Sequence, residues 1–401
     1  MSLTDLGTPG TSAFDSMIAW CREQRANGPV RYNDAQQSWE LYDYADVARV
    51  LSDPATFSSD FSGLAPSQED FDLFIKGDIT GVDPPRHRKL RNLVSQALTP
   101  RMVAGLAPSI RARTESLLDA LDGAERFDLV DALADPLPIM VIADMLGIPV
   151  GDWPLLRGWA ATMLGSDDVR DDTTQEDMAR ALEEIAPTVR ELNAYLRAHI
   201  QRCRAHPGDD LTSRLIAAEV DGQRLDDEEI LGFVGAVLSA GHITMTAMLT
   251  STIVLLEANQ QAAAELRADP ALRPGALDEV IRCRPPFPQI GRRTTTEVPV
   301  AGTVIPANAM ITLWVAAANR DGARFADPDR FDIHRKPNPH LAYGHGIHFC
   351  VGAPLARLEA SVVLDTLLER YRDIATEPAP EFRNPWLLTT AKSLPLRVSP
   401  A

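Results

Sequence analysis

The sequence is poor in cysteine and shows no paired cysteine spacing. Its four cysteines, Cys21, Cys203, Cys283 and Cys350, are scattered over 401 residues. This distribution argues against a disulfide scaffold and suits a reducing environment. The first residues, MSLTDLGTPGTS, also lack the basic start and apolar stretch of a signal peptide. We therefore expect a cytoplasmic protein.

Positive charge is scarce as well. The chain has 39 Lys and Arg against 56 Asp and Glu, which gives a formal net charge of −17. Such an excess of acid argues against nucleic acid and against an anionic membrane surface as the main partner. The sequence also contains no repeat, no low-complexity run and no linker rich in Gly or Ser. We expect a single domain over residues 1–401.

The hydrophobic pattern predicts a mainly α-helical chain with small β-sheets. Apolar residues recur at spacings of three and four between residues 100 and 284, and a last long helix is expected over residues 353–371. Strand-like pieces occur before residue 45 and over residues 292–314, where Thr, Val and Ile alternate around glycine and proline.

One apolar run, residues 230–256, contains no Asp, Glu, Lys or Arg and is long enough to cross a bilayer. It is flanked by acidic residues and lacks the Lys or Arg anchors of a membrane helix. A helix that is apolar on all sides can also be the central helix of a large soluble protein, which is the interpretation we favour. Asp226 and Glu229 have the spacing of a capping box at its start.

The stretch HLAYGHGIHFCVG, residues 340–352, gathers three histidines and one cysteine among three glycines. His340, His345, His348 and Cys350 could in principle bind zinc, but residues two apart on a tight loop are poorly placed around one tetrahedral ion. The usual CxxC or HxxxH pairs are missing too. A buried, inert cysteine is the second interpretation, and a thiolate under a haem is the third.

A haem thiolate would explain the whole pattern. Its negative charge needs N–H groups and a helix N-terminus nearby, and GAPLARLEA, directly after Cys350, reads as the start of a helix. Glycines at positions 344, 346 and 352 would let the backbone fold tightly around the sulfur and lie close to a flat macrocycle.

This loop resembles the haem-binding signature of the cytochrome P450 superfamily, aromatic–Gly–x–Gly–x–His–x–Cys–x–Gly. The resemblance covers about residues 15–398 and points to soluble bacterial members of natural-product biosynthesis. It implies the P450 fold, a helical prism around a buried haem b, with Cys350 as the iron ligand. The loop residues that it places at the haem are Tyr343 (where Phe is usual), Gly344, His348, Cys350 and Gly352.

Further segments match family motifs in the expected order. In ALDEVIRCRPP, Glu279 and Arg282 form an ExxR motif on one helix face and, by resemblance, join Arg330 of DPDRF in an ion-pair network behind the haem. Taken alone, this pair would be an ordinary surface pair. The segments DPPRHRKLR and IGRRTTTEVPVAG supply the other residues that, by resemblance, hold the haem propionates together with His348: His87, Arg91 and Arg292.

The apolar run contains LSAGHITMT, which resembles the oxygen-binding segment of the family. Ala240, Gly241 and Thr244 fit that segment, whereas Ile243 stands where an acid is usual. Ile243 cannot carry a proton, so we expect an active oxygenase with an altered proton supply. His242 projects about 100° away from this position, and we expect it to pack behind the helix.

By resemblance, the substrate pocket is lined by Phe71, Phe74, Met163, Leu164, Val237, Pro288, Ile290, Leu387 and Leu388. These residues favour a bulky hydrophobic natural product, such as a polyketide or macrolide. The resemblance implies a monomeric monooxygenase that hydroxylates or epoxidises this substrate with O2 and NAD(P)H electrons, delivered by ferredoxin reductase and ferredoxin. Two alternatives stay open: a P450 specialised for peroxide use or oxidative coupling, and a weakly catalytic recruitment or binding subunit of a biosynthetic assembly.

Overall fold

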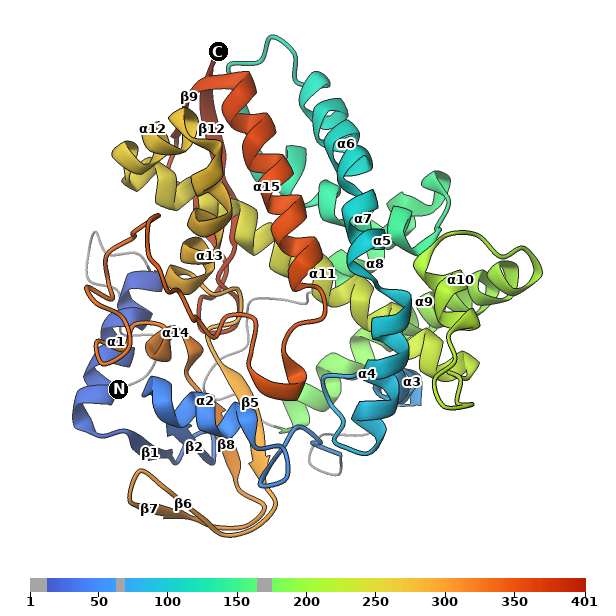
Figure 1. Cartoon of the computed structure of the whole chain (residues 1–401), viewed down its shortest axis with the longest axis vertical. Coiled ribbons are helices and arrows are strands. Elements are labelled where there is room, and N and C mark those ends of the chain that lie inside the picture. Colours follow the sequence, from blue (N-terminus) through green and yellow to red (C-terminus); the bar gives the residue numbers. More distant parts are fainter. Residues whose placement is uncertain (1–12, 63–68, 164–174) are drawn as a thin grey trace. The chain divides into compact units, whose positions relative to one another are not determined.

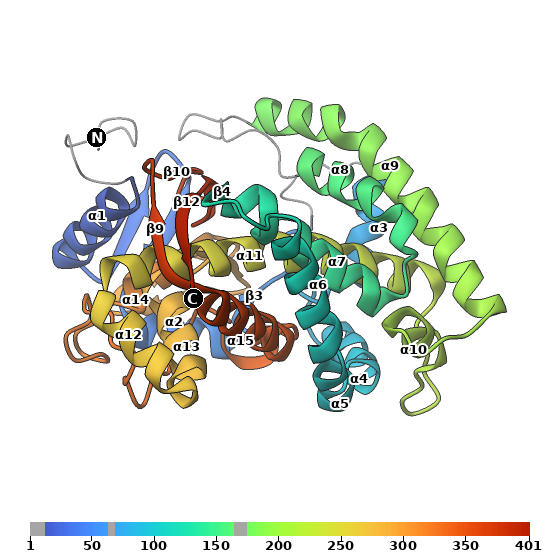
Figure 2. The same ribbon diagram turned by 90° about the horizontal axis from the view of Figure 1, so that it is seen from above.

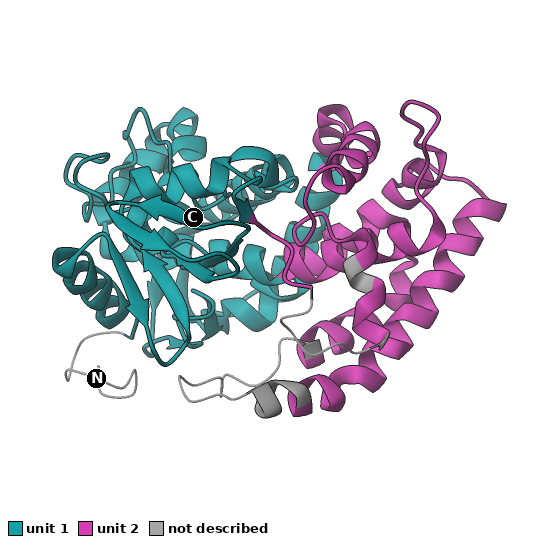
Figure 3. Cartoon of the chain, turned by 90° about the horizontal axis from the view of Figure 1, so that it is seen from below, with its two compact units in different colours: residues 1–57, 107–137, 243–401 teal, residues 58–106, 138–242 magenta. Residues whose placement is uncertain are grey.

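The computed structural model describes residues 13–62, 69–163 and 175–401 (Figure 1). The chain divides into two compact units, shown in Figure 3. Unit 1 comprises residues 1–57, 107–137 and 243–401, and unit 2 comprises residues 58–106 and 138–242. The expectation of one domain over residues 1–401 stays a prediction.

The sheets are small, as predicted. A five-stranded sheet has the order β1-β2-β8-β5-β3, in which β2 and β8 are parallel while β1–β2 and β5–β8 are antiparallel. A three-stranded antiparallel sheet has the order β4-β12-β9, and two hairpins pair β6 with β7 and β10 with β11. The strands are β1 (Val30–Asn33), β2 (Ser38–Leu41), β3 (Phe57–Ser58), β4 (Arg126–Asp128), β5 (Ile290–Thr294), β6 (Val298–Val300), β7 (Thr303–Ile305), β8 (Met310–Leu313), β9 (Tyr371–Thr376), β10 (Glu381–Phe382), β11 (Ala391–Ser393) and β12 (Pro395–Pro400).

Helices make up most of both units, which confirms the predicted mainly α-helical chain. The helices of unit 1 are α1 (Ala13–Asn27), α2 (Tyr44–Ser52), α6 (Ala107–Asp119), α12 (Gln260–Ala268), α13 (Arg273–Cys283), α14 (Val315–Ala318) and α15 (Ala353–Arg370), with the short turns η2 (Val130–Ala134), η4 (Pro270–Leu272) and η5 (Gly346–His348). Those of unit 2 are α3 (Glu69–Gly77), α4 (Arg86–Ala97), α5 (Pro100–Gly105), α8 (Trp153–Met163), α9 (Gln175–Ala205) and α10 (Leu211–Ala217), with η3 (Val150–Asp152). Helix α7 (Pro136–Leu146) begins in unit 1 and lies mostly in unit 2.

The apolar run forms one continuous helix, α11 (Asp227–Ala258), which passes from unit 2 to unit 1 after His242. The predicted capping box is present in both directions. The Glu229 N–H donates to Asp226 Oδ1 (2.8 Å), and the Asp226 N–H donates to Glu229 Oε2 (3.1 Å). In composition α11 could span a membrane, but 56% of its most apolar window is buried, as in a core helix.

Helices α13 and α15 lie side by side in unit 1 and run in opposite directions (Figure 1). Asp278 of α13 pairs with Arg357 near the start of α15 (2.8 Å), whereas Arg273 pairs with Asp365 further along α15 (2.6 Å). This packing fixes the start of α15, and with it the cysteine loop, against the ExxR helix.

Candidate functional site

The loop before α15 presents one cysteine at the surface. Cys350 is exposed, whereas the other three cysteines are buried. The Cys350 N–H donates to the Tyr343 carbonyl (2.8 Å), which closes the loop, and α15 starts at Ala353 without a side-chain cap. The uncapped N-terminus of a helix stabilises a nearby negative charge, so the thiol has the surroundings that favour a thiolate. An inert buried cysteine, the second sequence-based interpretation, is therefore wrong.

Two of the loop glycines are required by the backbone. Gly344 and Gly346 have φ values of 73° and 70°, a region that side chains other than glycine rarely adopt. A Cβ on Gly346 would also lie 2.6 Å from the Leu51 carbonyl oxygen. Gly352 is different, because its φ is −82° and a Cβ there would lie 3.8 Å from the Cys350 sulfur, an ordinary contact. The positive φ of the backbone thus explains Gly344 and Gly346, and it does not explain Gly352.

Replacing Gly346 by Ala should open this loop. The left-handed backbone costs roughly 1–2 kcal/mol for a non-glycine residue, and the contact with Leu51 adds to that cost. We expect a lower thermal midpoint and a smaller fraction of protein with thiolate-bound haem. Gly322→Ala is the matched control, since a Cβ there meets no atom within 4 Å. Equal behaviour of the two variants would show that the loop tolerates a side chain at position 346.

The histidines of the loop do not gather around one point. The His340 side chain is 4% exposed, with Nε2 3.7 Å from Asp278 Oδ1, while His345 is exposed. Within the described residues, no group of three His, Cys, Asp or Glu side chains could hold a metal ion. The zinc hypothesis is therefore wrong for this loop.

The ring of Tyr343 packs against the guanidinium of Arg357. The Arg357 guanidinium carbon lies 4.7 Å from the centre of the Tyr343 ring, and Arg357 is held by Asp278. Burial raises the pKa of the Tyr343 phenol, and the positive charge of Arg357 opposes this shift. The tyrosine therefore stays neutral at physiological pH.

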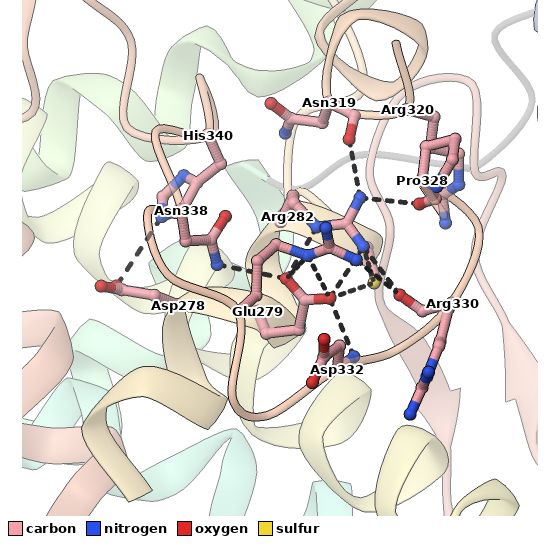
Figure 4. Close-up of polar contacts among 12 residues, drawn as sticks. Asp278, Glu279, Arg282, Asn319, Arg320, Pro328, Arg330, Asp332, Asn338 and His340 are labelled. Carbon is pink, nitrogen blue, oxygen red and sulfur yellow. Dashed lines mark hydrogen bonds and ion pairs between the residues drawn. The ribbon is translucent and has the colours of Figure 1, made fainter. Parts of the chain in front are cut away.

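Glu279 and Arg282 of α13 form a fully buried ion pair (Figure 4). Arg282 Nε and Nη2 donate to the two carboxylate oxygens of Glu279 at 2.7 and 2.8 Å. Its Nη1 donates to the carbonyls of Asn319 (2.8 Å) and Pro328 (2.7 Å). Every guanidinium nitrogen is used, so this pair is a rigid structural element and not the surface pair that its spacing alone would suggest.

The second cation of the network is Arg335, which sequence reasoning missed. Arg335 Nε donates to both oxygens of Glu279, at 3.1 and 3.2 Å. Arg330, the expected partner, contributes only its carbonyl oxygen, 3.0 Å from Arg282 Nη2, while its own side chain points away from Glu279 (Figure 4). The side chain that joins Glu279 and Arg282 in the ion-pair network is thus that of Arg335, where Arg330 was expected. Asn338 Nδ2 adds a further hydrogen bond to Glu279 (3.1 Å).

The predicted propionate ligands lie on regular elements of the two units. In unit 1, Arg292 is buried on β5 and its neighbour Arg293 is half-buried. In unit 2, His87 is buried and Arg91 is half-buried one turn later on α4. Burial lowers the pKa of His87, and the charge of Arg91 lowers it further, so His87 is neutral at pH 7.

The middle of α11 is more accessible than the stretches directly before and after it, residues 229–235 and 245–253. Ala240 is exposed, and Val237, Ile243 and Thr244 are half-buried, in a helix that is otherwise largely buried. Ala240 and Thr244 are four residues apart and share a face. On another side, a Cβ on Gly241 would lie 2.6 Å from the end of Ile142, so α7 packs closely there.

The predicted position of His242 also agrees with the structure. His242 is 2% exposed, which confirms that it packs into the interior behind the accessible stretch of α11.

The predicted pocket residues of unit 1 divide into core and surface. Pro288 and Leu388 are buried and belong to the core, whereas Ile290 is half-buried and Leu387 is 39% exposed. Phe287, which sequence reasoning missed, is 43% exposed. Pro288 and Leu388 are covered by the protein itself, so they support the exposed residues next to them and do not face solvent.

The predicted pocket residues of unit 2 are less completely described. Phe71 is half-buried on α3, which also carries Phe74, and Met163 is the last residue of α8. The side chains of Phe74 and Met163 and the whole of Leu164 lie outside the described residues.

The chain's own residues fit a haem. An exposed thiol beside an uncapped helix start supplies an anionic iron ligand. An uncharged, partly accessible stretch of α11 supplies an apolar surface that a bound macrocycle and its ligands could cover.

Known proteins agree with this interpretation. Residues 272–397 match the family model described as Cytochrome P450. The chain is 41% identical over 378 residues to cyclomarin C epoxidase CymV of Salinispora arenicola, covering 94% of both proteins. It is 45% identical over 372 residues to erythromycin C-12 hydroxylase of Saccharopolyspora erythraea, covering 90% of this chain and 89% of the relative.

Solved structures extend the similarity to the fold. The post-tailoring hydroxylase HmtN, involved in himastatin biosynthesis, aligns with a TM-score of 0.83 and 42% identity over 95% of this chain and 96% of its own. The predicted P450 fold is thereby confirmed. The chain belongs to the cytochrome P450 superfamily, and it is a haem-dependent monooxygenase.

Proposed function

We propose that this monooxygenase hydroxylates or epoxidises a bulky, mainly apolar natural product of the macrolide or polyketide kind. Its electrons come from NAD(P)H through ferredoxin reductase and ferredoxin, and it acts as a cytoplasmic monomer. Relatives that match over nine-tenths of this chain are named for the epoxidation of cyclomarin C and the hydroxylation of erythromycin, which supports this substrate class.

The observation that carries the proposal is an uncharged surface in unit 1, which we call the apolar surface. It is formed by the exposed and half-buried residues of the segments 285–291 and 385–390. Neither segment contains Asp, Glu, Lys, Arg or His. Two hydrogen bonds pin them together, Thr389 N–H to the Pro286 carbonyl (2.9 Å) and Gln289 Nε2 to the Trp386 carbonyl (3.0 Å). Both segments expose a large apolar side chain, Phe287 and Leu387. A rigid, uncharged surface of this kind suits an apolar ligand.

We assign the haem contacts to the residues of the family motifs. Cys350 would hold the haem iron through its thiolate, and the loop residues Tyr343, Gly344 and Gly352 would surround it. His87, Arg91, Arg292 and His348 would hold the propionates. The haem, when bound, supplies the activation of dioxygen. On the substrate side, Ala240 and Gly241 leave room on α11, and the Thr244 hydroxyl holds a proton or a water next to it.

A second candidate is turnover driven by peroxide. Ile243 stands at the usual position of an acid, and hydrogen peroxide already carries the protons that dioxygen must acquire. Peroxide-driven turnover as fast as turnover with ferredoxin and reductase would favour this candidate.

The proposed function is tested by turnover in ¹⁸O2. The purified protein, with ferredoxin, ferredoxin reductase and NADPH, is given macrolides and polyketides, and products are analysed by mass. We expect a product that gains one ¹⁸O atom. Conversion without ¹⁸O, or none across the panel while NADPH is consumed, would contradict the proposal.

A variant of the apolar surface tests the substrate class. Phe287→Ala should weaken binding of the converted substrate about tenfold, close to the 1.5 kcal/mol expected for one large apolar side chain. Val304→Ala, on β7, is the control, since Val304 is also exposed and apolar. Spectral titration measures both dissociation constants, and equal constants would remove Phe287 from the binding surface.

A further inference from the structure

A small cavity of unit 1 lies where helices α1 and α14 pack against each other (Figure 2). Its volume is about 40 Å³, enough for a few water molecules or one small ion. Arg22, Arg25 and Arg320 line the cavity together with a single carboxylate, that of Asp329. None of these four residues belongs to the haem or substrate residues assigned above, so the cavity is a separate feature of the unit.

Arg320, two residues after α14, lacks the acceptors that a buried guanidinium needs. Its side chain is 14% exposed, and its Nη1 is buried without a hydrogen-bond acceptor. Among the described residues, the one carboxylate within ion-pair distance is that of the exposed Asp329, whose Oδ1 lies 3.5 Å from Arg320 Nε. Arg282 shows the usual state, since each of its guanidinium nitrogens has an acceptor (Figure 4). A buried donor on a cation is costly without an acceptor, so we expect one in the cavity.

The other two arginines of the cavity already have acids as partners. Arg25 Nη2 donates to the buried Asp321, and its Nη1 donates to the Arg320 carbonyl (3.2 Å). Arg22 is exposed, and its Nη2 donates to Asp329 Oδ2 (2.9 Å). The guanidinium groups of Arg22 and Arg320 therefore share one carboxylate, which leaves the cavity one negative charge short.

The surroundings of Arg320 are apolar and hold a second buried cation. The guanidinium carbons of Arg320 and Arg284 lie 5.6 and 4.0 Å from the centre of the Phe14 ring. Phe14 and two residues of the cavity wall, Ile18 and Ala317, belong to one buried apolar cluster. Burial lowers the pKa of both guanidinium groups, because the acids nearby do not make up for the lost water. Charges in such surroundings are poorly screened and attract an anion strongly.

We propose that this cavity binds one small monovalent anion of the size of chloride, held by the Arg320 guanidinium. The Nη1 group of Arg320 donates to the anion, and Arg22 and Arg25 add positive charge from α1. The small volume favours chloride over sulfate or phosphate. The bound anion ties α1 to the segment after α14 and stabilises the folded protein. Neither the haem nor the substrate takes part, so the site is independent of the proposed function.

The test is a chloride titration of the thermal midpoint of the haem-loaded protein, with gluconate keeping the ionic strength constant. Since the anion binds only the folded protein, the midpoint of wild type should rise by about 1–2 °C for each tenfold increase of chloride above its dissociation constant. Arg320→Gln, which has neither the charge nor the guanidinium, should show no rise. Arg320→Lys keeps the charge but loses the fork of donors, so its rise should begin at about tenfold higher chloride.

Arg372→Gln is the matched control, because it removes the same charge from the surface of unit 1. Arg372 is exposed and pairs with Asp373 (3.1 Å). Its chloride dependence should equal that of wild type. A wild-type midpoint that does not depend on chloride, or an equal rise in wild type and Arg320→Gln, would overturn the proposal.

A second variant keeps all three arginines and fills the cavity instead. Ala317→Val adds two carbon atoms to a wall residue, so the chloride dependence should be lost, and this holds even where Arg320→Gln fails to fold. Bromide in place of chloride shows the site directly, since it scatters X-rays anomalously. We expect an anomalous peak next to Arg320 Nη1 in crystals of the loaded wild type and none in Ala317→Val. Water alone in the cavity, or an unchanged rise in Ala317→Val, would contradict the assignment.

Discussion

Replacing Glu279 by Gln is expected to lower the free energy of unfolding by about 3–5 kcal/mol, the cost of leaving a buried charge without its partner. The guanidinium groups of Arg282 and Arg335 both donate to the Glu279 carboxylate. The side chains of Glu279 and Arg282 are fully buried, so water cannot replace these contacts. A glutamine amide keeps the shape but supplies no negative charge, and its NH2 group faces a donor. Denaturant titration of the loaded protein measures the loss.

The control for this prediction is Glu265→Gln. Glu265 also pairs with a basic residue, His334 at 2.7 Å, but on the surface. Exposed pairs contribute little to stability, so the midpoint of that variant should equal that of wild type. A small effect at both positions would mean that the buried network is not needed to hold the cysteine loop, whose following helix packs against α13.

Local patterns were the most predictable part of the fold. The apolar run and its capping box predicted α11, because both depend on residues within one or two turns of each other. The last helix, expected over residues 353–371, is found at Ala353–Arg370. The ExxR spacing predicted the Glu279–Arg282 pair for the same reason.

Burial and long-range partners were less predictable. Arg335 lies 56 residues from Glu279, and no periodicity connects them, so the motif match to Arg330 pointed to the wrong side chain. Leu387 and Leu388 are adjacent and chemically identical, yet only the first is exposed, because the direction of the backbone in the turn decides which one faces outward. Glu359 of α15 is 1% exposed, and its burial could not be predicted, since a glutamate on a helix is usually on its surface.

The haem residues depend on both kinds of information. The signature around Cys350 identified the loop, and the structure adds the exposed thiol, the uncapped start of α15 and the positive φ of Gly344 and Gly346. The conformation of that loop, and not its histidines, is what makes the cysteine available to a metal.

The central claim is that the Cys350 sulfur binds the haem iron as an anion. Cys350→Ala removes the only strongly electron-donating ligand that the loop offers, so monooxygenase turnover should be lost. Cys203→Ala is the control, since Cys203 is buried in unit 2. The most direct measurement is the absorption spectrum of the reduced protein under carbon monoxide. We expect the red-shifted band of thiolate-bound haem in wild type and Cys203→Ala, and its complete loss in Cys350→Ala. A wild type without that band, or a Cys350→Ala variant that keeps it, would contradict the account.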